Sequence, residues 1–276
     1  MKAKKIEIAS ATIIYFDDWR KEAADVDSRL RLLDSIAEEI RRSRIAIDLL
    51  MLPAGFLQVR SSAELDKLAD RVRRRAPDLA VLFGIDVNEA KNHGAKRKGG
   101  KDPALGNFAY MATAGRRGPI WGAQQLAASS SHCVHWSRVP NDRVVRLGDN
   151  GGAAIGVLVC GEVMADVYGR GKIFRKLREM VHHADVVLDI AHADVRWHRS
   201  APRTWRQALR NAGHHVIVAH HLGQQALCRK LKTLAPNGEP HLIATTQARS
   251  QAKRLIVSNA DSAEVTAYVD VYRLQL

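Results

Sequence analysis

The sequence has little cysteine and no long apolar run. Its three cysteines, Cys133, Cys160 and Cys228, lie far apart in a chain of 276 residues, and no two of them have the Cys-x-x-Cys spacing. Thiols so few and so scattered exclude a disulfide framework and the common redox motif, and we expect them to be reduced. No apolar run approaches the length of a membrane span or of a signal peptide. We therefore expect a cytoplasmic protein without a membrane partner.

Negative charge is also scarce. Lys and Arg number 43 against 29 Asp and Glu, which gives a formal net charge of +14. This charge permits an anionic partner, although a solvated basic surface is the simpler interpretation because the basic residues are spread along several predicted helices. The glycine-rich segment 91–101 is strongly basic, and Lys96, Arg97 and Lys98 in it are the candidates for binding an anion. No aromatic residue is interleaved there to stack on bases, so a solvated loop is the competing interpretation.

Strand-like and helix-like segments alternate along the chain. We predict strands over 6–16, 45–52, 79–87, 107–113, 184–191 and 215–219, and amphipathic helices over 26–44 and 64–75. The 46% hydrophobic content can bury a sizeable core, and no composition shift marks a boundary. These patterns predict an α/β fold in a single domain over 1–276.

A buried strand is predicted over Ile155 to Val159, and it stops at Cys160, which is followed by Gly161 and Glu162. α/β folds place nucleophiles at such a position, with the side chain exposed in a crevice and backbone N–H groups nearby to hold an oxyanion. The alternative is that Cys160 packs as a small hydrophobic residue.

The residues around Cys160 resemble the nitrilase, or carbon–nitrogen hydrolase, superfamily, whose nucleophile strand reads as an apolar run, Cys, an aromatic residue, and Asp or Glu. Cys160 and Glu162 match this pattern, and Gly161 departs from it. The segment 184–190 resembles the family's next strand, and 49–56 resembles the strand and turn that carry its catalytic glutamate. The resemblance implies a nitrilase-like four-layer α-β-β-α sandwich, a homo-oligomer and no cofactor.

In this family a cysteine thiolate attacks an amide or nitrile carbon, a glutamate acts as base and acid, and a lysine stabilises the oxyanion. Cys160 fits the first role. Ala54 stands where the resemblance expects the glutamate, and the lysine position falls near Gln125, in a stretch without lysine from Lys101 to Lys172. Losing either group costs about a hundredfold to a thousandfold in rate. The triad of the family is therefore degenerate here.

Two functions from different classes follow from the resemblance. The first is an amide hydrolase with a rewired site that works through a Cys160 thioester on a small amide or nitrile. The second is a catalytically inactive nitrilase-fold protein that serves binding or assembly, with an anionic partner suggested by its charge. The groups within hydrogen-bonding reach of the Cys160 sulfur discriminate between them, because a carboxylate and a cation there favour the enzyme.

Several residues could replace the missing base. Glu162 is one, although it could instead cap the next helix or fix the turn. His132, His135 or His192 could activate Cys160 as histidines do in other cysteine hydrolases, but the sequence does not show which of them lies near the thiol. His132 and His135 also flank Cys133 in a pattern of zinc-ligand types, yet further ligands at suitable spacing are missing, so we expect no metal site.

Overall fold

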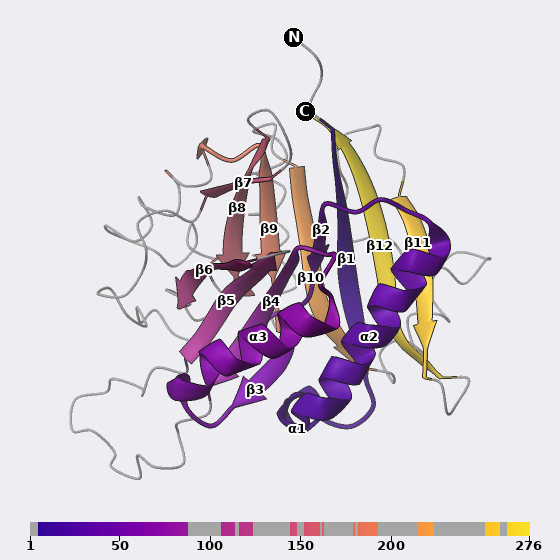
Figure 1. Cartoon of the computed structure of the whole chain (residues 1–276), viewed down its shortest axis with the longest axis vertical. Coiled ribbons are helices and arrows are strands. Elements are labelled where there is room, and N and C mark those ends of the chain that lie inside the picture. The colour runs from indigo at the N-terminus through magenta and orange to yellow at the C-terminus, as the bar shows by residue number, and fades with distance from the viewer. Residues whose placement is uncertain are drawn as a thin grey trace.

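A computed structural model describes residues 5–87, 106–113, 116–123, 144–147, 152–160, 162, 179, 182–192, 215–223, 252–259 and 264–276. Within these residues, twelve strands and three α-helices follow one another (Figure 1). The strands are β1 (Lys5–Tyr15), β2 (Leu49–Met51), β3 (Leu57–Val59), β4 (Val81–Val87), β5 (Gly106–Thr113), β6 (Arg116–Ala123), β7 (Val144–Leu147), β8 (Ala153–Val159), β9 (Val186–Ile190), β10 (His215–Gly223), β11 (Ala252–Ser258) and β12 (Val265–Gln275). The helices are α1 (Trp19–Ala24), α2 (Val26–Ser43) and α3 (Leu65–Arg75), and a 3-10 turn covers Ser62–Glu64.

The strands form one mixed sheet. Nine of them follow the order β6-β5-β4-β2-β1-β10-β9-β8-β7, while β12 pairs with β1 and β11, and β3 pairs with β4. The strands β4, β2, β1, β10, β9 and β8 run parallel to their neighbours within this series. Because the carboxyl ends of parallel strands lie at the same edge of a sheet, residues that follow these strands are candidates for a common site.

The sheet curls until its first limb, which contains β2, β4 and β5, faces its second limb, which contains β8 and β9. β5 and β8 are in contact, although five strands separate them in the sheet order. A single apolar cluster lies between the limbs and joins Met51 of β2 and Leu82 of β4 to Val157 of β8 and Leu188 of β9. We call it the inner cluster. The curl therefore brings together strand ends that are distant in the flat sheet order.

Two helices cover the outer face of the sheet (Figure 1). α2 packs on β3, β11 and β12, and α3 packs on β4, β5 and β6. Leu33 and Ile36 of α2 and Leu68 of α3 are buried in a second apolar cluster with Phe83 of β4. Their spacing places each helix's apolar residues on one stripe, which explains the prediction of amphipathic helices over these segments. At the start of α2 the side chain of Asp25 accepts the backbone N–H of Ser28 at 3.0 Å, as an N-cap does.

The structure confirms an α/β fold, with a mixed sheet that curls and with helices packed on it. Leu158, Val187 and Val216 point away from the inner cluster on β8, β9 and β10, and they are buried too. A parallel sheet is normally covered on both faces, so this burial supports a fourth layer. The complete α-β-β-α sandwich stays a prediction, because the segments that would form that layer lie outside the described residues.

Two strand predictions were wrong in length. β2 is shorter than the predicted strand 45–52, because the Asp48 carboxylate accepts the N–H of Glu7 at 2.7 Å where a strand would offer a backbone carbonyl. β10 is longer than the predicted strand 215–219 and continues to Gly223, because its last residues pair with β1, with His221 opposite Ile13. This extension places two histidines within a buried strand.

Candidate active site

Cys160 directly follows the buried strand β8, as predicted. Its φ angle is 48°, in the left-handed region that residues with a Cβ rarely adopt. Such a conformation costs on the order of 1 kcal/mol and is concentrated at functional sites. The side chain is partly exposed and packs against the inner cluster. The thiol therefore sits on a strained turn at the end of a strand, as nucleophiles of α/β hydrolases do.

Glu162 lies in the same turn and is fully buried. Its Oε2 accepts the backbone N–H of Val159 at 2.9 Å. A carboxylate that binds the last N–H of a strand satisfies a donor that would otherwise be left without a partner, and it fixes the turn that follows. The geometry therefore gives Glu162 a role in shaping the turn, and its predicted catalytic role stays a prediction.

Ala54 follows β2 and belongs to the inner cluster, against which Cys160 also packs. It is 1% exposed. The neighbouring strand β4 passes very close, because a Cβ placed on Gly84 would lie 2.3 Å from the Ala54 Cα. The position where the resemblance expects a glutamate is thus occupied by a small apolar side chain in tightly packed surroundings.

His192 lies two residues beyond the end of β9 and connects Cys160 with a carboxylate. Its Nε2 is 3.1 Å from each carboxylate oxygen of Asp86. Cys160 lies near enough for its charge to raise the pKa of His192 as well. The side chains of His192 and Asp86 are 15% and 16% exposed, so the pair is shielded from bulk water but remains accessible. Cys160, His192 and Asp86 are therefore candidates for the nucleophile, the base and the orienting carboxylate of a covalent hydrolase.

The electrostatics of this group favour a charged imidazole. Burial lowers the pKa of His192, but the charges of Asp86 and Cys160 and its hydrogen bonds to both outweigh burial, and the pKa lies well above 6.5. The charged form of the His192 imidazole is therefore favoured near neutral pH. Thiolate is the nucleophilic form of cysteine, and a neighbouring His⁺ is one of the groups that stabilise it.

The strand arrangement explains how the three residues meet. Cys160 and His192 follow the adjacent parallel strands β8 and β9, so they emerge at the same edge of the sheet. Asp86 lies on β4 in the opposite limb, and it shares a face with Leu82 because strand residues two or four apart point the same way. The curl of the sheet then places its carboxylate against the imidazole.

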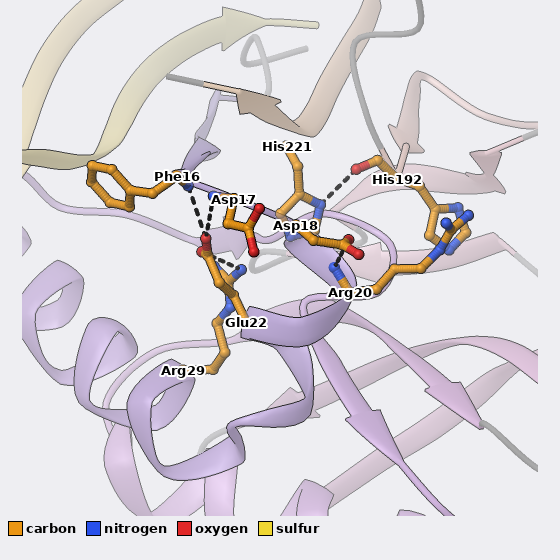
Figure 2. A network of polar contacts seen from close by, with 8 residues as sticks. All are labelled: Phe16, Asp17, Asp18, Arg20, Glu22, Arg29, His192 and His221. Carbon is orange, nitrogen blue, oxygen red and sulfur yellow. Dashed lines mark hydrogen bonds and ion pairs between the residues drawn. The ribbon is translucent and has the colours of Figure 1, made fainter. Parts of the chain in front are cut away.

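His221 holds the backbone of His192. Its Nδ1 lies 2.6 Å from the His192 carbonyl oxygen, and its backbone N–H donates to the same oxygen at 3.3 Å (Figure 2). Burial and the nearby Arg29 charge lower the pKa of His221 well below 6.5. The imidazole is therefore neutral, and its Nδ1 carries the hydrogen, because a carbonyl can only accept.

Some of the candidate residues lie close to Cys160 in the structure, and others lie outside the described residues. Of the three histidines that could activate Cys160, His192 lies near enough for Cys160 to raise its pKa, and His132 and His135 lie outside the described residues. Asp86 was missed, although an acidic residue inside the apolar strand 79–87 is a signal that could have found it. The predicted positions that also lie outside the described residues are Gln125, Lys96, Arg97 and Lys98.

The arginines of the two long helices do not form a bare cationic face. Five of them are ion-paired with carboxylates of the same helices, which partly neutralises the positive charge of this surface. The pairs are Arg41–Glu38, Arg42–Glu39, Arg71–Asp27, Arg73–Asp70 and Arg75–Asp34.

The part of the chain that the structure describes also bears on metal binding and on membrane insertion. No group of three or more His, Cys, Asp or Glu side chains there is arranged to hold a metal ion. None of the described helices is long and apolar enough to cross a membrane.

Solved structures resemble the chain in fold, whereas no protein-family model and no curated protein matches its sequence. An amidase from Nesterenkonia sp. aligns over 100% of this chain and 92% of its own, with a TM-score of 0.55 and 16% identity. A mutant of the Nesterenkonia AN1 amidase, described as from the nitrilase superfamily, aligns over the same shares with a TM-score of 0.56 and 18% identity. Another mutant, carrying the acetamide moiety of fluoroacetamide on its active site cysteine, aligns over 99% and 90% with a TM-score of 0.56 and 16% identity. The chain therefore has the nitrilase fold, as predicted.

Proposed function

We propose that the protein hydrolyses the carbon–nitrogen bond of a small amide through a thioester at Cys160, with His192 as general base and acid. The observation that carries the proposal is the position of His192, whose Nε2 lies 3.1 Å from both carboxylate oxygens of Asp86 and whose pKa is raised by the nearby Cys160. The pair replaces the glutamate and lysine that the resemblance expects near Ala54 and Gln125. It supplies the carboxylate and the cation whose presence beside the thiol favours an enzyme over a binding protein.

The first half-reaction forms the thioester. Transfer of the Cys160 proton to His192 gives a thiolate and an imidazolium, and the thiolate attacks the carbonyl carbon of the amide. As the tetrahedral intermediate collapses, the imidazolium donates its proton to the leaving amine and the carbon–nitrogen bond breaks. This protonation is required because an amide anion is a very poor leaving group.

The second half-reaction releases the acid. His192, now neutral, takes a proton from a water molecule as the water oxygen attacks the thioester carbon. The carbon–sulfur bond then breaks, and the thiolate returns to its pairing with the imidazolium. The products are a carboxylic acid and ammonia or an amine. Asp86 takes no part in these proton transfers, since its part is to orient the imidazole and to stabilise its positive charge.

The comparisons support the choice of amides as the substrate class. The structural neighbours are described as amidases, and one is described in complex with acrylamide. Another carries an acetamide moiety covalently bound at its active site cysteine. In our proposal Glu162 keeps the turn in shape rather than transferring protons, because one of its oxygens is already bound to the Val159 N–H.

The test is ammonia release from acetamide, propionamide and acrylamide, combined with mass spectrometry of the quenched protein. We expect turnover by the wild type, an acyl adduct on the peptide that contains Cys160, and no turnover by Cys160→Ala. His192→Ala should lower kcat/KM by about a hundredfold to ten-thousandfold, the range for losing a general base.

The matched control is His183→Ala, because His183 is exposed and lies nine residues before His192 in the same part of the chain. It should retain wild-type rates. If the wild type forms no adduct and Cys160 reacts with iodoacetamide no faster than Cys133 or Cys228, the proposal fails. The inactive binding or assembly protein would then be the better account of the sequence.

A further inference from the structure

We propose that His221 is a positioning residue of this site, which acts by holding the backbone carbonyl of His192 and thereby fixes the imidazole between Asp86 and Cys160. The inference rests on the proposed roles of Cys160 and His192. His221 itself touches neither the thiol nor the carboxylate in any contact described above, so its effect must pass through His192.

The backbone geometry shows why this hold is needed. The pairing of β9 with β10 continues for one residue beyond β9, where the Ala191 N–H donates to the Ala219 carbonyl at 2.8 Å. At His192 the chain leaves the sheet, and its carbonyl accepts two hydrogen bonds from one residue, the His221 backbone N–H at 3.3 Å and the His221 Nδ1–H at 2.6 Å. The side-chain bond is the shorter of the two, so it anchors His192 where regular strand pairing ends.

The charge of His221 matters as much as its hydrogen bond. His221 is fully buried, and the buried guanidinium of Arg29 lies near it. The charges of His192 and His220 also disfavour its protonation, whereas its hydrogen bond to the His192 backbone favours it. Two adjacent imidazolium groups repel each other, so a neutral His221 leaves His192 free to carry the positive charge that the Cys160 thiolate requires.

Arg29 is in turn held in place from the end of β1. Its guanidinium pairs with Glu22 Oε2 at 3.4 Å, while Glu22 Oε1 accepts the backbone N–H groups of Phe16 at 2.8 Å and Asp17 at 3.4 Å. Figure 2 shows these contacts beside the bond between His221 and His192. The start of the helical region and the end of β1 thus set the electrostatic surroundings of the positioning residue.

The test compares three substitutions of His221 in the full chain. His221→Asn keeps an N–H at the position of Nδ1, whereas His221→Gln places its amide nitrogen near the position of Nε2, and His221→Leu has no donor. The readout is the rate at which iodoacetamide alkylates Cys160, followed by peptide mass spectrometry as a function of pH, together with kcat/KM for acetamide. Thermal unfolding of each variant monitors folding.

We expect His221→Leu and His221→Gln to alkylate at least tenfold more slowly near neutral pH, with the pH midpoint of alkylation moved upward. His221→Asn should stay within about threefold of the wild type. If His221→Leu does not fold, His221→Gln takes its place in the comparison. The proposal would be overturned if all three variants showed the pH profile of the wild type. It would also be overturned if His221→Asn and His221→Gln lost alkylation rate equally, in proportion to their loss of thermal stability.

The two proposals can fail separately. Alkylation reports on the thiolate whether or not any amide is hydrolysed. A shifted alkylation profile in a protein without amidase activity would support the positioning role and reject the proposed reaction. Amidase activity with an unshifted alkylation profile would support the proposed reaction and reject the positioning role of His221.

Discussion

The imidazole Nε2 of His192 lies 3.1 Å from both carboxylate oxygens of Asp86, although three other strands separate β4, which carries Asp86, from β9, which His192 follows. Only the curl of the sheet brings them together. Because the contact joins the two limbs, it depends on the packing of the inner cluster as well as on local geometry. Substitutions at Asp86 therefore test the proposed mechanism and the fold at the same time.

Asp86→Asn should change the pH dependence of amide hydrolysis. The carboxylate is the largest influence that raises the pKa of His192 against the lowering effect of burial. Without its charge the imidazolium loses its proton at lower pH, so the alkaline limb of the kcat/KM profile should move toward lower pH. We also expect kcat to fall by about a hundredfold or more, because the asparagine no longer stabilises the imidazolium.

Asp78→Asn is the control for this substitution, since Asp78 is exposed just before β4. Its profile should match that of the wild type. An unchanged alkaline limb in Asp86→Asn would mean that His192 is not the group that protonates the leaving amine.

The sequence predicted the parts of the fold that depend on local patterns. The apolar stripe through Leu33 and Ile36 predicted α2, and the apolar run that stops at Cys160 predicted β8 and its exposed thiol. The contact between Asp86 and His192 could not be predicted in the same way. It depends on strand order and on the curl of the sheet, which long-range packing decides.

His221 shows a second reason for the incomplete prediction. Two adjacent histidines are a weak strand signal, so the predicted strand ended at Ala219. In the structure β10 continues because β1 provides backbone partners as far as Tyr15. Tertiary pairing overrides local propensity here, and it buries a residue that the pattern alone places beyond the strand.

His221 should make stability fall at mildly acidic pH. Its pKa in the folded state lies well below 6.5, so below that pH the unfolded chain binds a proton that the folded protein does not. The free energy of unfolding must then decrease as pH falls, by about 1 kcal/mol from this residue over the first pH unit below its unfolded pKa. Urea unfolding across this pH range should show a smaller decrease in the free energy of unfolding for His221→Asn than for the wild type.

The wild type and His221→Asn both retain the carboxylates and His192. Their comparison therefore cancels the contribution of those groups to the pH dependence. His183→Asn serves as the control, because an exposed histidine should leave the slope unchanged. If the free energy of unfolding depended on pH identically in the wild type and in His221→Asn, His221 would have to take up a proton in the folded state.

Glu22→Gln should destabilise the protein through the charge that it leaves behind. Arg29 is 4% exposed and Glu22 is 30% exposed, so the pair is partly shielded from water. Loss of one partner of a fully buried pair costs about 3 to 5 kcal/mol, and the exposure of Glu22 reduces our expectation to about 2 kcal/mol. The measurement is urea unfolding at neutral pH.

Glu38→Gln provides the matched comparison for Glu22→Gln. Glu38 pairs with Arg41 on the exposed side of α2, where an ion pair contributes about 0.5 kcal/mol or less. Equal losses in the two variants would contradict the assignment of Arg29 as a buried cation that needs Glu22.

Gly84→Ala should damage both stability and the site. The Gly84 N–H donates to the Pro53 carbonyl at 3.1 Å, and an added Cβ would lie 2.3 Å from the Ala54 Cα and 2.7 Å from the Gly55 nitrogen. These are backbone atoms, so no side-chain rotation can relieve the clash, and β4 must move away from the turn after β2. Forcing extra volume into such packing costs about 3 kcal/mol. Asp86 lies two residues farther along β4, so the same movement should withdraw its carboxylate from His192.

Gly223→Ala separates this effect from the general cost of replacing a strand glycine. Its added Cβ would meet the Tyr15 ring at 3.1 Å, and a side chain at a strand end can turn aside. We expect about 1 kcal/mol of destabilisation there and no change in the alkylation rate of Cys160, against a clear decrease of that rate in folded Gly84→Ala. Wild-type stability in Gly84→Ala would show that the turn carrying Ala54 does not press on β4. In that case the small residue at position 54 would leave room for a larger side chain beside Cys160.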